Sequence, residues 1–270
     1  MKCLAKIFST FVHQNQKDKS EFMLIKRIFI TILILTAYFS QAYAQMTKSM
    51  NEDKKEVLPQ YYYSEKEMDM VSAYIEKQYG MYDLVAHEVA SPDIHCDIVV
   101  IPPTEEQPYY KLVTMGAGAY IMDVPKGLRS YVCDRAEYVI FLPQNWNLES
   151  DKEEDYWPIR MLKFIARLPI AAEDWLCEGH DVQLVEDGST VAENTGFNSC
   201  VLMPSIGKEG QEVEPLKLGL GGKKVAFYQL FPLYPEELKF KLEHGYDELV
   251  ELFEKEPLIV NIHRRNYCNE

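Results

Sequence analysis

Two short clusters in the chain hold residue types that could do chemistry. Cys177 and His180 lie three residues apart in W-L-C-E-G-H, so a thiol and an imidazole could meet in one loop. A cysteine nucleophile needs a base within hydrogen-bond reach, usually oriented by a third group, and Asp174 or Asp181 could orient the imidazole. The spacing therefore allows a small cysteine-dependent hydrolase as one alternative. No sequence feature marks an oxyanion hole, so we favour a structural loop.

His95 and Asp97 form the second cluster, on one face of the segment Ile94–Ile101. A metal centre would need a third and a fourth ligand, and the spacing supplies neither. No C-x-x-C pair is present, so a zinc framework is not expected. We expect a polar pair at the end of a buried strand, hydrogen-bonded to a neighbouring loop, with no metal and no cofactor.

The elements that would position these clusters are many strands and few helices. Apolar runs rich in β-branched residues predict strands, and these runs lie at 84–90, 94–101, 109–115, 137–142, 199–203, 225–231 and 258–262. Both faces of Ile94–Ile101 are apolar, which predicts a central strand covered on two sides. The segment 176–195 reads as a loop. The combination predicts an α+β fold with a mixed, mostly antiparallel β-sheet flanked by helices.

The predicted helices have boundary signals of their own. Ser64-Glu65-Lys66-Glu67 fits a capping box, and Gly80 would end the helix that follows. Asp155 would cap a second helix, with Pro158 in its first turn and Pro169 at its end. Further along, proline and two carboxylates predict a third helix start, at 235–237, and a short fourth helix over 247–254.

The N-terminal region differs from the rest of the chain. Lys26-Arg27 is a positive stretch, Ile28–Ala37 is apolar, and Ala42-Tyr43-Ala44 is a small-x-small cleavage signal. These features predict a signal peptide over residues 1–44, with Met23 as an alternative start of translation. The apolar run is short for a spanning helix, so a membrane anchor is the less favoured alternative.

Residues 45–60 are polar and charged, which predicts a flexible leader before a single domain over 61–268. We expect an exported protein, periplasmic or secreted, with no stable membrane insertion after cleavage. The net charge of the 270 residues is −14. Beyond the N-terminal region no basic run is longer than two residues, so no nucleic-acid partner is expected. An acidic surface could attract a basic partner instead.

Several motifs together resemble the Suppressor of fused domain family in its bacterial form. They are H-C-D-I-V-V-I-P-P-T-E-E at 95–106, Y-Y-K-L-V-T-M-G at 109–116, W-P-I-R-M-L-K-F-I-A-R at 157–167, W-L-C-E-G-H at 175–180 and F-Y-Q-L-F-P-L-Y-P-E-E-L at 227–238. The resemblance implies a SUFU-like domain that binds proteins and is not an enzyme. It also implies a set of family-motif residues as candidates for interaction: His95, Asp97, Glu105, Trp157, Arg160, Trp175 and His180.

The resemblance also limits the classes of partner that we expect. Bacterial relatives are often proposed as immunity proteins for polymorphic toxins, so we expect a protein partner, either a toxin or an envelope protein. The chain ends shortly after its last predicted strand, and we expect it to lack the C-terminal half with which animal members clasp their ligand. A Hedgehog-type role is therefore not carried over. An envelope scaffold that pairs an edge strand with a peptide is a further alternative, beside the hydrolase.

Overall fold

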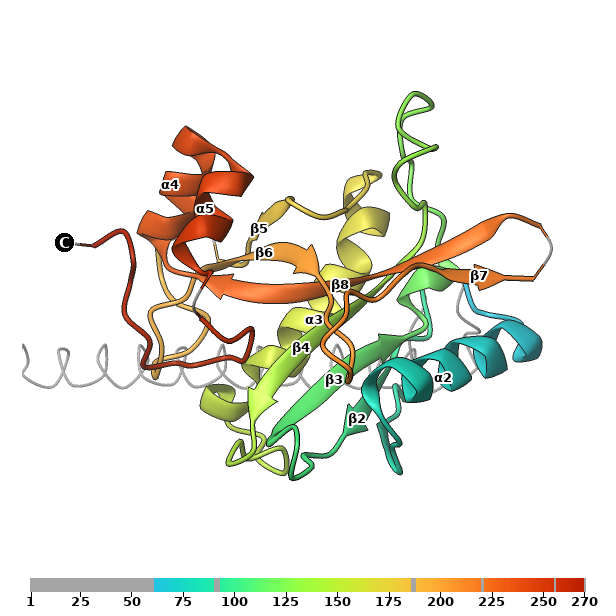
Figure 1. Ribbon diagram of the computed structural model, residues 1–270, viewed down its shortest axis with the longest axis horizontal. Coiled ribbons are helices and arrows are strands. Elements are labelled where there is room, and N and C mark those ends of the chain that lie inside the picture. Colours follow the sequence, from blue (N-terminus) through green and yellow to red (C-terminus); the bar gives the residue numbers. More distant parts are fainter. Residues whose placement is uncertain (1–60, 90–92, 186–187, 220, 255, 270) are drawn as a thin grey trace, which may run out of the picture. The chain divides into compact units, whose positions relative to one another are not determined.

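The computed structural model describes residues 61–89, 93–185, 188–219, 221–254 and 256–269 (Figure 1). The signal peptide and leader predicted for residues 1–60 lie outside this part of the chain. The strands are β1 (Leu84–Ala86), β2 (Asp97–Ile101), β3 (Tyr109–Met115), β4 (Ala136–Pro143), β5 (Asp181–Gln183), β6 (Ser199–Pro204), β7 (Leu216–Leu218) and β8 (Lys223–Leu233). The helices are α2 (Glu65–Tyr79), α3 (Glu153–Ala172), α4 (Pro235–His244) and α5 (Tyr246–Leu252). None of these helices is long and apolar enough to cross a membrane.

The strands form one mixed sheet in the order β1-β2-β3-β4-β8-β6-β5, and β7 pairs with β8 beside this path. Only β4 and β8 run parallel, whereas every other neighbouring pair is antiparallel. Parallel neighbours need a long crossover connection, and here that connection contains α3. The predicted α+β fold with a mostly antiparallel sheet is confirmed.

Helices α2 and α3 cover opposite faces of the sheet (Figure 1). Successive strand side chains point to opposite faces, so Ile98 and Val100 pack in the cluster that contains the apolar side of α3. Val99 and Ile101 pack in the cluster that contains the apolar side of α2. The two-sided cover predicted for this strand is confirmed, and each aliphatic side chain buried in this way contributes about 1.5–3 kcal/mol.

Helix α2 begins with the predicted capping box. The Glu67 N–H donates to Ser64 Oγ at 3.3 Å, and the Ser64 N–H donates to Glu67 Oε2 at 3.1 Å. Gly80 ends the helix at φ 123°, a backbone conformation that other residues rarely adopt.

Helix α3 is longer than the sequence predicted. It begins after Lys152 and ends at Glu173, which has φ 51°. Asp155 therefore lies in the first turn and is not the cap, and both Pro158 and Pro169 lie inside the helix. The prediction placed the end of the helix at Pro169 because a proline interrupts the helical hydrogen bonds, but the helix continues to Ala172.

Several predictions of strands and loops need correction. The strand predicted over 84–90 is shorter, and β1 covers only Leu84–Ala86. The run at Ile94 becomes a ladder only from Asp97, because Ile94 forms an isolated bridge with Tyr61. The strand predicted over 258–262 is wrong, because this segment forms no ladder. It is attached to the sheet by two single hydrogen bonds: the Val260 N–H donates to the Phe141 carbonyl at 2.8 Å, and the Gln229 side-chain amide donates to the Leu258 carbonyl at 2.5 Å. The segment 176–195, predicted as a loop, contains the edge strand β5.

A buried carboxylate lies in the centre of the sheet. Glu137 of β4 is fully buried and accepts hydrogen bonds from Tyr63 Oη at 2.8 Å and from Thr114 Oγ1 at 2.6 Å. The backbone N–H groups of 116, 117 and 118 donate to it at 3.0, 3.2 and 3.1 Å. Burial raises the pKa of Glu137, while these donors act in the opposite direction. The network connects the start of α2 to the turn after β3.

The C-terminal segment is held by a buried ion pair. Arg264 donates two hydrogen bonds of 2.5 Å to the carboxylate of Glu237 in α4, and the two side chains are 4% and 0% exposed. The guanidinium also donates to the Pro232 carbonyl at 2.9 Å and lies 4.8 Å from the ring centroid of Tyr234. A buried bidentate pair is costly to break, so the chain after α5 is fixed against the sheet.

Candidate functional site

A groove of about 420 Å³ lies between α3 and the edge strand β5. Phe164 and Leu168 of α3 line one side, and Trp175, His180 and Val182 belong to the opposite side. Phe164 is 43% exposed, although it is a large apolar residue. A concave apolar surface of this kind is where a folded chain most often receives another molecule.

One long side of the groove is an unpaired strand edge. β5 is the last strand of the sheet. The His180 carbonyl accepts a hydrogen bond of 2.8 Å from the β6 side, and the Leu184 N–H donates one of 2.9 Å toward that side. Because alternate residues of an antiparallel strand direct their backbone groups to opposite sides, Asp181 and Gln183 direct theirs away from β6. No strand within the described ranges pairs with that side, so it can receive an extended peptide.

Trp175 and His180 form an aromatic pair at the groove. Their ring centroids are 4.5 Å apart at 55°. Burial lowers the pKa of His180, and the nearby positive charge of Lys241 lowers it further. Lys241 in turn forms an ion pair with Asp181. The imidazole is therefore held as a neutral aromatic surface.

The geometry around Cys177 does not support the hydrolase alternative. The Cys177 thiol donates to the carbonyl oxygen of Glu178 at 3.2 Å, and the imidazole of His180 instead packs against Trp175. Burial, together with the charge of Glu178, raises the pKa of Cys177 to about 11. Because a nucleophilic cysteine needs a lowered pKa and an adjacent base, this pair lacks both requirements.

His95 and Asp97 lie together as predicted, as a polar pair at the start of β2. His95 Nε2 is 3.1 Å from Asp97 Oδ1, and a second imidazole, that of His87, lies 3.0 Å from Asp97 Oδ2. The Glu88 N–H donates to Asp97 Oδ1 at 2.9 Å, so the carboxylate is hydrogen-bonded to the neighbouring segment as expected. In the part of the chain that the structure describes, no group of three such side chains is arranged to hold a metal ion.

The remaining candidates belong to neither cluster. Glu105 is exposed in the loop between β2 and β3. Trp157 is 1% exposed, and its indole N–H has no hydrogen-bond acceptor among the described residues. Arg160 forms an ion pair with Glu153 and donates to the Val191 carbonyl at 2.7 Å. Trp157 and Arg160 therefore contribute to the fold and Glu105 is an exposed loop residue, whereas Trp175 and His180 line the groove.

Sequence reasoning missed two residues of these networks. His87 lies opposite Asp97 when the register of β1 with β2, which pairs Leu84 with Val100, is extended by three residues. A register argument across the turn could have found it. Glu137 had a clearer signal, because an acidic residue at the start of an apolar strand run must have hydrogen-bond donors around it if it is buried.

The comparisons with known proteins bear on the family and on the fold. The family model for Suppressor of fused protein (SUFU) matches residues 92–265. No match is found among curated proteins. The crystal structure of a SUFU homolog from Neisseria gonorrhoeae FA 1090 superposes with a TM-score of 0.53 at 18% identity, covering 77% of this chain and 100% of that one. It is therefore similar in fold.

Two further solved structures are more distant. A chain of the Sufu–Fu complex matches with a TM-score of 0.49 at 14% identity, over 74% of this chain and 90% of that one. Drosophila Suppressor of Fused matches with a TM-score of 0.46 at 12% identity, and the match covers 74% of this chain and 50% of that one.

Proposed function

Because the chain belongs to the Suppressor of fused protein family, we propose that it is an exported, non-enzymatic domain that binds an extended segment of another protein. The observation that carries the proposal is the groove beside β5, where an unpaired strand edge adjoins an apolar hollow. A bound strand would take its main-chain hydrogen bonds from Asp181 and Gln183, and alternate side chains of that strand would fill the hollow.

The residues that line the groove indicate which amino-acid types the bound segment would contain. Its apolar members, such as Phe164 and Leu168, fit one aliphatic or aromatic side chain of the partner. Lysine and arginine are absent from the lining, whereas Asp174 contributes an exposed carboxylate. A segment that alternates apolar and basic residues is therefore the best fit, and it agrees with the net charge of −14.

The predicted signal peptide supports a partner in the cell envelope or outside the cell. We propose that this partner is a toxin that the domain neutralises, or another envelope protein. Fractionation of cells that express the full chain tests the location: the proposal requires a shortened protein outside the cytoplasm. A full-length protein retained in the cytoplasm contradicts the proposed export.

Site-specific photo-crosslinking tests the binding surface. A photoreactive amino acid at Phe164 or Gln183 should give a specific crosslinked product from the native envelope, which mass spectrometry identifies. The same group at Tyr131, which is 87% exposed, is the matched control and should give no such product. Trp175→Ser should remove the product while the circular dichroism spectrum stays unchanged.

Equal crosslinking at the groove and at Tyr131 would show that the groove is not the binding surface. Products that persist in Trp175→Ser would lead to the same conclusion.

A further inference from the structure

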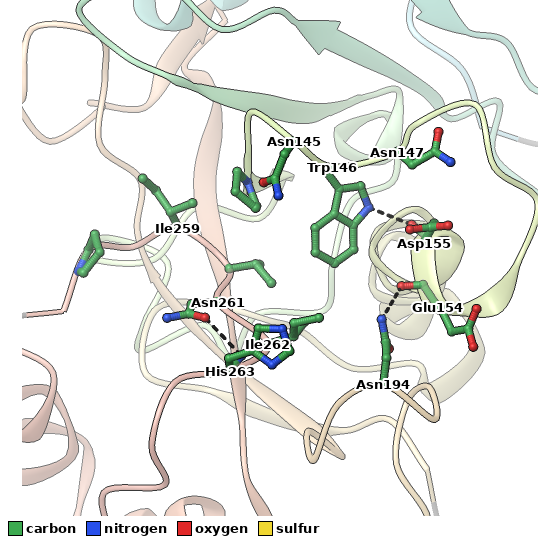
Figure 2. A pocket seen from close by; sticks show the side chains of 13 residues that line it. Asn145, Trp146, Asn147, Glu154, Asp155, Asn194, Ile259, Asn261, Ile262 and His263 are labelled. Atoms are coloured by element: carbon green, nitrogen blue, oxygen red, sulfur yellow. Dashed lines mark hydrogen bonds between the residues drawn. The ribbon is translucent and has the colours of Figure 1, made fainter.

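A second cavity, of about 450 Å³, lies at the N-terminal end of α3, whereas the groove beside β5 adjoins the C-terminal half of that helix. It is formed by the loop after β4, the first turn of α3, the side chain of Asn194 and the C-terminal segment 257–263. Figure 2 shows the indole of Trp146 in the middle of the view, with Asn145 beside it and Ile262 and His263 across from it. The volume falls within the range of about 300–1,000 Å³ typical of small-molecule sites.

Trp146 provides a rigid aromatic platform. Its indole N–H donates to the Asp155 carbonyl at 2.8 Å, and its ring contacts Trp157 edge-on, at 5.9 Å and 80°. These two contacts fix the plane of a side chain that is only half-buried. A core tryptophan would be covered on both faces, whereas one side of this ring borders an open cavity.

Both walls of the cavity are fixed as well. Asn194 donates to the Glu154 carbonyl at 2.9 Å, which attaches its loop to α3. On the C-terminal side, the Val260 N–H donates a hydrogen bond to the Phe141 carbonyl. Shortly after it in the chain, Arg264 forms the buried ion pair with Glu237. A ligand would meet a preformed site and would have little ordering cost to offset.

The rim of the cavity is rich in amides. Asn145 and Asn147 are exposed, and neither side-chain amide has a hydrogen-bond partner within the described ranges. Each amide can donate and accept at once. His263 adds an exposed imidazole on the opposite side. Such groups suit a ligand with many hydroxyl groups, which also donate and accept.

The charges of the lining disfavour anionic ligands. Glu154 and Asp155 belong to the lining, and no lysine or arginine does. Phosphates and carboxylates would therefore be repelled. A cation would be bound best by several aromatic faces, whereas Trp146 is the single indole in this lining.

We propose that this cavity binds a neutral saccharide, with the C–H face of one sugar ring packed on Trp146 and its hydroxyl groups bonded to Asn145 and Asn147. Packing against a preoriented indole supplies the dispersion contacts. The amides select a polyhydroxylated ring over an apolar side chain. No residue that lines this cavity also lines the groove beside β5. Saccharide binding can therefore be tested independently of the proposed protein binding.

Isothermal titration calorimetry tests the site with neutral tetrasaccharides of glucose, mannose, galactose, xylose and N-acetylglucosamine as probes. At least one should give saturable binding to the chain. Trp146→Ala should weaken that binding by about tenfold or more, the loss expected when about 1.4 kcal/mol of contact is removed. The double change Asn145→Ala with Asn147→Ala should weaken it without altering the circular dichroism spectrum.

Two variants serve as controls. Trp175→Ala, in the groove beside β5, should bind the same saccharide with unchanged affinity. Trp146→Phe keeps an aromatic face and should retain part of the affinity, even if Trp146→Ala fails to fold. The proposal is overturned if no saccharide binds at about 10 mM, well above millimolar dissociation constants, or if Trp146→Ala binds as the unchanged chain does. Tighter binding of choline or arginine than of any saccharide would also overturn it.

Discussion

The side-chain amide of Asn194 donates a hydrogen bond of 2.9 Å to the carbonyl oxygen of Glu154, the group that Pro158 leaves without a helical donor. In a regular helix the N–H of residue 158 would donate to the carbonyl of residue 154. Proline has no N–H, so a residue from a distant loop supplies the donor. This contact explains how α3 continues through Pro158, and it fixes one wall of the cavity at Trp146.

The contact predicts an interaction between two substitutions. Asn194→Ala should lower the free energy of unfolding by about 1 kcal/mol, since it removes one hydrogen bond. In a Pro158→Ala background the same change should cost less, because the new N–H of residue 158 can donate to Glu154. Urea unfolding of both single variants and the double variant measures the coupling.

The control for this cycle is Asn147→Ala, whose amide has no partner in the described part of the chain; its effect should be within about 0.5 kcal/mol. Equal costs of Asn194→Ala with and without Pro158 would contradict the explanation.

A second prediction concerns Glu137. Glu137→Gln should destabilise the fold by about 3 kcal/mol or more, because the new amide directs N–H groups at donors such as Tyr63 and Thr114. Thermal unfolding measures the change. Glu105→Gln, an exposed carboxylate in a loop, is the matched control and should shift stability by no more than about 0.5 kcal/mol. Similar effects of the two substitutions would show that the network around Glu137 is not a source of stability.

A third prediction follows from the buried lysine of β3. Lys111 is 1% exposed and donates from Nζ to the Tyr79 carbonyl at 2.9 Å. Burial, with a contribution from Lys208, lowers the pKa of Lys111 from 10.5 to about 8. Between these two values the unfolded chain holds more protons on this group than the folded chain. Its contribution to stability therefore rises as the pH increases from about 8 to about 10.5.

Comparison of the chain with Lys111→Met isolates this contribution, because the tyrosines and cysteines that titrate in the same range are common to both. The stability difference between them should change by on the order of 2–3 kcal/mol between pH 8 and pH 10.5, in favour of the unchanged chain at high pH. Lys66→Met, at an exposed position, should show no such pH-dependent difference. A flat difference for Lys111→Met would show that its ammonium group is not destabilised by burial.

The sequence predicted those elements whose signals are local. The continuous apolar run Ile98–Ile101 predicted a doubly covered strand, because neighbouring residues of a strand point to opposite faces. The capping box at Ser64 is equally local and is present in the structure. The continuation of α3 through Pro158 has no local signal, since the donor to the Glu154 carbonyl comes from Asn194, forty residues after Glu154 in the chain. The apolar run at 258–262 is partly buried without a ladder, and apolar character alone does not distinguish these cases.

The groove beside β5 and the cavity at Trp146 also differ in how much of each could be predicted from the sequence. Trp175 and His180 are close in sequence, so their shared position at the groove could be predicted. The unpaired outer side of β5 could not, because edge position depends on the order of the whole sheet. The cavity at Trp146 gave no sequence signal, since its lining joins the loop after β4 to the segment near His263. Only tertiary packing brings these parts together.

The last prediction tests the chemistry of Cys177. Its thiol donates to the Glu178 carbonyl, and burial together with the Glu178 charge raises its pKa to about 11 from the ordinary value of 9.0. Only the thiolate reacts with iodoacetamide, so alkylation of the folded chain should be slow at neutral pH. The rate, followed on the Cys177 peptide by mass spectrometry, should rise with a midpoint near pH 11. Glu178→Gln should move the midpoint down, because it removes the second cause of the shift.

The urea-unfolded chain is the control, in which the same peptide should react with a midpoint near the ordinary value of 9.0. Circular dichroism at each pH shows whether the fold is intact during the measurement. A midpoint well below 9 in the folded chain, or rapid alkylation at pH 7, would reveal an activated thiolate. That result would restore the hydrolase alternative, whereas a slow thiol with a high midpoint leaves Cys177 as a structural residue next to the groove beside β5.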